Sequence, residues 1–140
     1  YINAILEVHT SLDPYALLAL CQQVEAHHHR VRLVRWGPRT LDIDVITYDD
    51  LVSDDPALTL PHPRAHERAF VLVPWEQANP QAVIPSRDAA TGEQTRHLVA
   101  DLARRVRAAD ERAGVNAVRF MRDMNLPKNL FDSGAESEGV

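Results

Sequence analysis

The sequence predicts an α+β protein, because two kinds of apolar periodicity occur in it. The runs 1–8 and 41–48 alternate between apolar and other residues, as β-strands do. The runs 14–26 and 97–109 repeat apolar residues at intervals of three and four, as amphipathic helices do. We expect a sheet with helices packed against it.

Length and composition are those of one globular domain. The chain has 140 residues, of which 45% are hydrophobic and 25% charged, and both fractions are ordinary for a globular protein. We expect a single domain over residues 1–131. The segment 132–140 is polar and rich in Gly, Ser and Glu, so we expect it to be disordered.

Net charge and cysteine content indicate which partners and which compartment suit the protein. A net charge of −5 argues against a general nucleic-acid or membrane-surface binder. Positive charge is concentrated in one stretch, which favours a small anionic ligand, and it comes from Arg30, Arg32, Arg35 and Arg39. The single cysteine, Cys21, allows no internal disulfide, and no apolar run reaches membrane-spanning length. We therefore expect a cytoplasmic protein that binds neither nucleic acid nor a membrane.

The two faces of the run 1–8 differ in chemistry. If the run is a strand, one face is uniformly apolar and should belong to the core, with Ile2, Ala4, Leu6 and Val8. The other face mixes aromatic, amide, aliphatic and acidic side chains, as the wall of a binding pocket does, with Tyr1, Asn3, Ile5 and Glu7.

A helix should begin at Asp13 and Pro14. Asp13 can cap the backbone N–H groups of the first turn, and Pro14 suits the first helical position because it has no N–H. The apolar stripe of this helix predicts a buried face that includes the cysteine, with Leu17, Leu18, Leu20, Cys21 and Val24. The polar residues Gln22, Gln23 and Glu25 are expected off the stripe.

The same helix is expected to end at the histidines 27–29. Consecutive helical residues point about 100° apart, so the three cannot all face one metal ion. Positive side chains near a helix C-terminus suit its dipole, and a zinc site is the less favoured alternative. Arg30 and Arg32 would then share one face of an extended segment, where paired guanidinium groups suit a polyphosphate.

The run 41–48 carries the most informative pair of side chains, Asp42 and Asp44. Two carboxylates on one strand face repel each other, so positive charge should lie beside them. That charge can come from Mg²⁺, which binds one or two carboxylates plus phosphate oxygens, or from Arg35 and Arg39 of the preceding Arg-Trp-Gly-Pro-Arg turn. The alternative is an exposed acidic edge strand with Arg39 as a surface counter-ion.

The remaining segments have weaker signals. The acidic, turn-rich segment 49–56 predicts a surface loop, and the two prolines of 58–63 indicate a short extended piece. Beyond residue 80 we expect, in order, an extended piece at 83–85, a polar loop at 86–93, a helix at 97–109 whose arginines face solvent, and a strand at 116–121.

Two motifs resemble the 6-hydroxymethyl-7,8-dihydropterin pyrophosphokinase family. They read Arg-Trp-Gly-Pro-Arg-Thr-Leu-Asp-Ile-Asp at 35–44 and Leu-Pro-His-Pro-Arg-Ala-His-Glu-Arg-Ala-Phe at 60–70, and the resemblance runs from residue 1 to about residue 80. It implies a ferredoxin-like α+β fold, an antiparallel-dominated sheet with helices packed on its faces. It also implies a folate-pathway enzyme that transfers pyrophosphate from MgATP to the hydroxymethyl group of the pterin and releases AMP.

The resemblance also implies roles for individual residues. Two Mg²⁺ ions would be held by Asp42 and Asp44. Catalytic roles would fall to Arg30, Arg39 and Asp44. The co-substrate ATP would be bound by Gln22, Arg30, Arg32, Arg35, Arg39, Thr59, His62 and Arg68. The pterin would be bound by Tyr1, Asn3, Trp36, Asp42 and Phe70, with Tyr1 and Phe70 on opposite faces of its ring.

Each of these roles has a structural alternative. Phe70 could be a core residue, since three apolar residues follow it, and His62 could be a loop histidine that bonds only to backbone. Trp36 could be a local hydrophobic anchor.

The chain departs from the family pattern in several places. Members carry a strand, a helix and a strand upstream of the position of Tyr1, and this sequence does not include them. The connection from Arg32 to Arg35 is one residue short, Leu33 stands where a lysine is frequent, and Pro63 where some relatives have an aromatic. Two alternatives follow: a non-catalytic nucleotide- or anion-binding module, and a fragment that functions only with its N-terminal segment. A fused or paired folate-pathway segment is a further expected partner.

Overall fold

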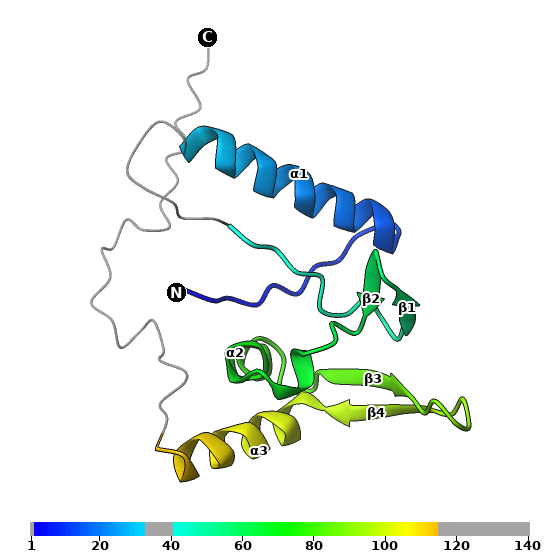
Figure 1. Cartoon of the computed structure of the whole chain (residues 1–140), viewed down its shortest axis with the longest axis vertical. Helices are drawn as coiled ribbons and strands as arrows, with labels where there is room; N and C mark the ends of the chain where they lie inside the picture. Colours follow the sequence, from blue (N-terminus) through cyan, green and yellow to red (C-terminus); the bar gives the residue numbers. More distant parts are fainter. Residues whose placement is uncertain (1, 33–40, 115–140) are drawn as a thin grey trace.

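A computed structural model describes residues 2–32 and 41–114; residue 1 and the ranges 33–40 and 115–140 lie outside the described residues. In chain order the elements are α1 (Pro14–Arg32), β1 (Ser53–Asp55), β2 (Leu58–Leu60), the short 3-10 helix η1 (Ala65–Glu67), α2 (Ala69–Ala78), β3 (Val83–Arg87), β4 (Gln94–Leu98) and α3 (Val99–Arg112) (Figure 1). The predicted α+β class is confirmed. Among the described residues, strands pair only as two antiparallel hairpins, β1–β2 and β3–β4. No helix in this part of the chain combines the length and hydrophobicity that a membrane crossing requires.

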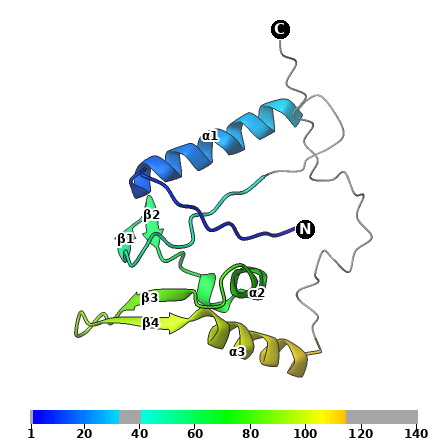
Figure 2. The ribbon, with the colours of Figure 1, turned by 180° about the vertical axis from the view of Figure 1, so that it is seen from behind.

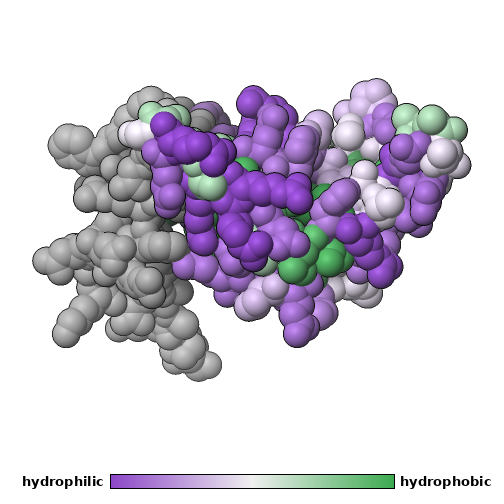
Figure 3. All heavy atoms as spheres, turned by 90° about the horizontal axis from the view of Figure 1, so that it is seen from below, coloured by the Kyte–Doolittle hydropathy of each residue, from purple (hydrophilic) through white to green (hydrophobic). Residues whose placement is uncertain are grey.

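The core lies where α2 and α3 pack with β3. Helix α2 is almost entirely apolar and buries Ala69, Val71, Leu72, Val73 and Trp75. Helix α3 is amphipathic: its Val99 and Ala103 are fully buried in the same cluster, whereas Arg104 and Arg105 are exposed. Seen from the α3 side, the surface is mostly hydrophilic (Figure 3). The helix expected at 97–109 with solvent-facing arginines is therefore confirmed, with its start moved to Val99.

The hairpin β3–β4 supplies the sheet under this core. Its register pairs Val83 with Leu98 and Arg87 with Gln94, so the extended piece predicted at 83–85 is confirmed and is longer than expected. The turn closes on Asp88, whose Oδ1 accepts the backbone N–H groups of Ala90 and Thr91 at 2.9 and 2.7 Å. Strand β4 was not predicted because every one of its residues is exposed and its sequence lacks apolar alternation.

The acidic segment 49–56 is not simply a loop. Its second half forms β1, which pairs with β2 so that Asp54 lies opposite Thr59. The turn between them is closed by Asp55, whose Oδ1 accepts the backbone N–H of Ala57 at 2.9 Å. Leu58 and Leu60 are buried, and burial on the second strand stabilises a hairpin whose first strand is acidic.

Helix α1 begins as predicted and ends later. The backbone N–H of Ala16 donates to Oδ1 of Asp13 at 2.9 Å, so the expected cap is present. The helix continues past the histidines to Arg32, because neither Gly nor Pro interrupts the sequence before Gly37. The prediction that Arg30 and Arg32 lie on an extended segment is therefore wrong: both belong to the last turn of α1.

The segment 2–8 is not part of a sheet, and its faces are reversed relative to the prediction. Leu6 is 84% exposed, and Ile2 and Val8 are exposed as well, whereas Ile5 packs against the core cluster. Glu7, which alternates with Ile5, accepts a hydrogen bond from Nδ2 of Asn79 at 2.9 Å. Alternation sets a period of two and does not say which face will be covered, so the prediction that the Ile2 face is core is wrong.

Substituting Leu72 by Ala tests the placement of the core. Leu72 has no exposed surface, and a cavity left by Leu→Ala in a core costs about 2–5 kcal/mol. We expect the free energy of unfolding, measured by urea titration, to fall by an amount in that range. The matched control is Leu20→Ala on α1, where the side chain is 45% exposed, and an equal loss in both variants would contradict this core.

Candidate functional site

The two candidate carboxylates lie on a segment without regular secondary structure. No strand is assigned over 41–48, so the predicted strand is wrong, although part of its alternation survives. Asp42 and Asp44 are exposed, whereas Ile43 and Val45 are half-buried. The pattern places both acids toward solvent, as expected for an i, i+2 pair in extended backbone.

This segment, residues 41–46, lies between α1 and α2, next to the segment 2–8, in both views of the chain (Figures 1 and 2). No strand of the described chain pairs with its backbone, which is held instead by hydrogen bonds to two other segments. The N–H of Ile43 donates to Oε1 of Glu25 on α1 at 2.5 Å. On the other side, the N–H of His62 donates to the carbonyl oxygen of Ile46 at 2.8 Å. The segment that carries the two acids and the loop that carries His62 are therefore adjacent and joined by a backbone hydrogen bond.

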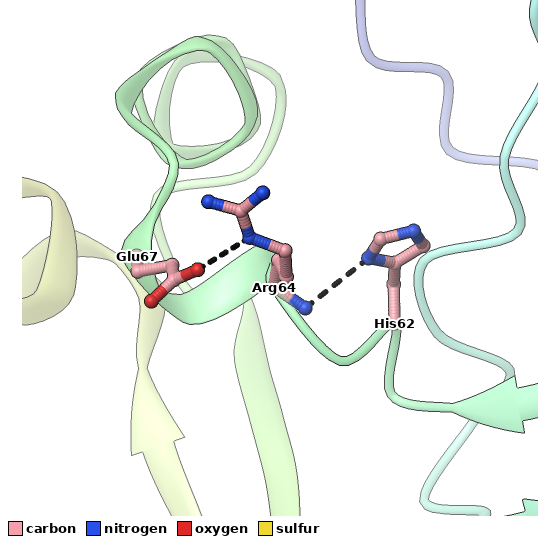
Figure 4. Close-up of polar contacts among 3 residues, drawn as sticks. All are labelled: His62, Arg64 and Glu67. Carbon is pink, nitrogen blue, oxygen red and sulfur yellow. Dashed lines mark hydrogen bonds and ion pairs between the residues drawn. The ribbon is translucent and has the colours of Figure 1, made fainter.

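His62 is oriented by the loop that follows β2. Its Nδ1 accepts the backbone N–H of Arg64 at 3.3 Å, and Nε of Arg64 donates to Oε1 of Glu67 at 2.6 Å (Figure 4). Because Nδ1 is the acceptor, the proton of the neutral ring resides on Nε2, which becomes the donor position toward a ligand. The Arg64 guanidinium holds the pKa of Glu67 below its usual range.

Arg68 and Phe70 form a second pair at the start of α2. Phe70 is 41% exposed, although the residues on both sides of it are buried, so the interpretation of Phe70 as a core residue is wrong. The guanidinium carbon of half-buried Arg68 lies 5.5 Å from the centre of the Phe70 ring. A cation over an aromatic face at this distance is favourable, and the pair presents a flat apolar surface beside a positive charge.

Two further contacts attach α1, and Leu12 two residues before it, to segments that follow the acids in sequence. The hydroxyl of Tyr48 donates to the carbonyl oxygen of Leu12 at 2.5 Å, and the hydroxyl of Tyr15 donates to Oδ2 of Asp55 on β1. The Tyr15 hydrogen bond lowers the pKa of Asp55 and raises that of Tyr15. Both tyrosines join the N-terminal end of α1 to segments that follow the acids in sequence.

Cys21 is half-buried on α1. Burial, and next the charge of Glu25 one turn later, raise the pKa of its thiol. A raised pKa disfavours the reactive thiolate, so the surroundings of Cys21 do not favour a role as a nucleophile.

For the other predicted site residues the structure gives exposure, backbone position or neither. Asn3 and Gln22 are exposed, and Thr59 is half-buried with its hydroxyl donating to the carbonyl oxygen of Asp55 at 3.1 Å. Arg30 and Arg32 are placed on α1 by their backbone only. The residues outside the described ranges are Tyr1, Arg35, Trp36 and Arg39.

Glu25 is the residue that sequence reasoning missed. It was expected off the apolar stripe of α1, yet it is half-buried and bonded to Ile43. Its position was available as a signal, because residue 25 follows Cys21 by one helical turn and shares its face.

The donor set of the segment 41–46 suits magnesium. Two exposed carboxylates two residues apart are what Mg²⁺ takes from a protein when it keeps water and phosphate oxygens as its other ligands. Among residues 2–32 and 41–114, no group of three or more His, Cys, Asp or Glu side chains is arranged to hold a metal ion by itself. Asp42 and Asp44 thus fit an ion shared with a phosphate ligand.

Comparison with known proteins gives the following matches. Residues 1–80 match the family model described as 7,8-dihydro-6-hydroxymethylpterin-pyrophosphokinase. A 2-amino-4-hydroxy-6-hydroxymethyldihydropteridine pyrophosphokinase of Methylorubrum extorquens is 43% identical over 102 residues, which are 73% of this chain and 61% of that protein. The enzyme of the same name from Haemophilus influenzae is 40% identical over 91 residues, covering 65% and 57%. The bifunctional protein FolKE of Lactococcus lactis is 46% identical over 74 residues, covering 53% and 21%. The chain thus spans about three fifths of the length of the first two relatives.

Replacing Tyr15 by Phe tests the contact between α1 and β1. Without the hydroxyl we expect the pKa of Asp55 to rise toward its ordinary value, because the Tyr15 hydrogen bond is the main cause of its lowering. A depressed carboxyl pKa stabilises the fold above the ordinary pKa, and this contribution disappears as the pH falls through the lowered one. Stability curves of the two proteins should therefore differ near neutral pH and converge in acid.

A carboxyl ¹³C NMR titration measures the Asp55 pKa directly. Tyr48→Phe serves as the control, since Tyr48 donates to Leu12 and not to Asp55. An unchanged Asp55 pKa in the Tyr15 variant would contradict the contact.

Proposed function

Because the chain belongs to the 7,8-dihydro-6-hydroxymethylpterin-pyrophosphokinase family, we propose that it acts in folate synthesis by transferring pyrophosphate from ATP to a pterin. The hydroxymethyl oxygen of 6-hydroxymethyl-7,8-dihydropterin attacks the β-phosphorus, the bond from that phosphorus to the bridging oxygen of AMP breaks, and AMP leaves. The observation that carries the proposal is the hydrogen bond from the His62 N–H to Ile46 at 2.8 Å. It joins the segment with the two exposed acids to the loop with the histidine.

We assign Asp42 and Asp44 to two Mg²⁺ ions. When bound, such ions neutralise phosphate charge and polarise the reacting oxygens. The acids supply this site at low cost because both are exposed, so they need not be taken out of water before the ligand arrives. We assign Asp44 a catalytic role because the Mg²⁺ ion that it would hold polarises the reacting oxygens.

Hydrogen-bond donors of the site are assigned to the phosphates of ATP. His62, whose Nδ1 is engaged with the Arg64 N–H, is proposed to donate from Nε2, and Arg68 is proposed to contribute its charge from beside the Phe70 ring. Arg30 and Arg39 are proposed to balance charge as the phosphorus–oxygen bond changes, and the remaining ATP contacts are assigned to Gln22, Arg32, Arg35 and Thr59. Positioning and electrostatics then account for most of the rate, because phosphoryl-type transfer needs little covalent help from a protein.

The pterin is assigned to the exposed face of Phe70. A flat heterocycle stacks on an aromatic ring, and Tyr1 is proposed to cover its other side, while Asn3, Trp36 and Asp42 complete the pterin site. The exposure of Phe70 in an otherwise buried stretch of α2 supports this assignment.

Two assignments reach beyond the site. A fused or paired folate-pathway segment is proposed as a partner, since one relative carries the name of a bifunctional protein. The cytoplasmic location expected from the single cysteine stays a prediction.

Replacing Asp44 by Ala tests the magnesium assignment. Loss of a carboxylate that holds Mg²⁺ removes several kcal/mol of transition-state stabilisation, so AMP formation from MgATP and 6-hydroxymethyl-7,8-dihydropterin should fall by at least about a hundredfold. The fold should survive, because Asp44 is exposed. The control is Asp54→Ala, which removes an exposed acid from β1, and undiminished turnover in the Asp44 variant would refute the assignment. AMP formation by the unaltered protein also separates catalysis from mere nucleotide binding.

Replacing Phe70 by Ala tests the pterin assignment. Stacking of a nucleobase on an aromatic side chain contributes about 1–3 kcal/mol, and we expect the affinity for the pterin to fall by a similar amount. Affinity for MgATP should change less. Calorimetric titration of each ligand measures both, with Phe70→Tyr as the control that keeps an aromatic face. Equal losses for the two ligands would count against a ring-stacking role.

A further inference from the structure

We infer that Glu25 of α1 is a positioning residue, whose carboxylate holds the backbone amide between Asp42 and Asp44 and so sets how the two acids meet a magnesium–phosphate ligand. The magnesium part of this inference rests on the proposed function. The holding of the segment by Glu25 does not, because it follows from a contact between described residues.

The contact joins two elements that are distant in sequence. Oε1 of Glu25 accepts the N–H of Ile43 at 2.5 Å, across eighteen residues of chain, and the contact is part-buried. Hydrogen bonds in which the acceptor is ionised are shorter and about twice as strong as neutral ones. The partner is an amide and not a guanidinium or ammonium group, so the bond fixes backbone position instead of neutralising a charge.

The amide of Ile43 has a specific place in the candidate site. It lies between the two acids in sequence, and three residues further along the segment the carbonyl oxygen of Ile46 accepts the N–H of His62. Asp44 is therefore enclosed between two anchored backbone groups. Without a strand partner, a segment of this kind keeps its shape only through such individual bonds.

The surroundings of Glu25 favour a role in position over a role in binding. Its side chain is half-buried and follows Cys21 by one turn of α1, whereas Gln22 and Gln23 on the same helix are exposed. The carboxylate is already engaged with Ile43. Because its carboxylate already accepts the Ile43 N–H, Glu25 would affect a ligand indirectly, by setting the position of the segment 41–46.

Two substitutions separate the acceptor from the charge. Glu25→Ala removes the acceptor, and Glu25→Gln keeps a carbonyl oxygen that can accept the same N–H. The amide exchange rate of Ile43, measured by NMR on the unliganded protein, should rise about ten- to hundredfold in the Ala variant and much less in the Gln variant. The Mg²⁺ concentration for half-maximal AMP formation should likewise rise in the Ala variant and return toward the original value in the Gln variant.

The control variant is Gln23→Ala, an exposed substitution on the same helix, which should change neither quantity. A merely structural role would lower the urea midpoint without a specific change at Ile43 or in the Mg²⁺ response. Unchanged exchange at Ile43 in the Ala variant overturns the inference, and so does a Gln variant as impaired as the Ala variant. If the unaltered protein forms no AMP, the proposed function fails, while the Ile43 exchange still decides whether Glu25 holds the segment.

Discussion

Two carboxylates that lie two residues apart repel each other, so the backbone that carries them must be held by something other than their side chains. In this chain that constraint is met by hydrogen bonds from both sides. Glu25 on α1 binds the N–H of Ile43 at 2.5 Å, and the His62 N–H binds the carbonyl oxygen of Ile46 at 2.8 Å. The acids themselves remain exposed, and this division leaves their oxygens available for a cation while the backbone between them is fixed.

Individual hydrogen bonds also hold α1, which contributes little to the hydrophobic core. None of the fully buried apolar residues of the described chain belongs to α1, and the core is built by α2, α3 and β3 instead. The helix region is attached by polar contacts at Leu12, Tyr15 and Glu25, which reach Tyr48, Asp55 and Ile43 respectively. Polar contacts of this kind have directional geometry, so they orient the helix relative to the acids more sharply than apolar contact would.

The sequence predicted well where a local rule decides the outcome. The cap at Asp13 and the amphipathic α3 both depend on neighbours within a turn or two. Prediction failed where burial depends on what covers a face: Leu6 is exposed although its face is uniformly apolar, and Glu25 is half-buried although it is charged. Within the candidate site, spacing predicted that Asp42 and Asp44 lie on one side of an extended segment, and both are exposed, while their binding of Mg²⁺ stays a prediction. Long-range bonds such as that from Ile43 to Glu25 leave no trace in spacing, because eighteen residues separate the partners.

Helix α2 shows why exposure adds information that composition cannot. A helix that is apolar all round should be buried all round, and the sequence from Ala69 to Trp75 gives no reason to single out one position. The structure does so: Phe70 is exposed and Pro74, one turn later, is half-buried, while the other residues of this stretch are buried. Pro74 also has no N–H to donate to the carbonyl oxygen of Phe70, so this side of α2 lacks both cover and one helical hydrogen bond. Packing within the fold does not account for an exposed aromatic ring on that side, whose centre lies 5.5 Å from the Arg68 guanidinium carbon. Stacking of a flat heterocycle on the ring, as we propose for the pterin, would supply the missing cover.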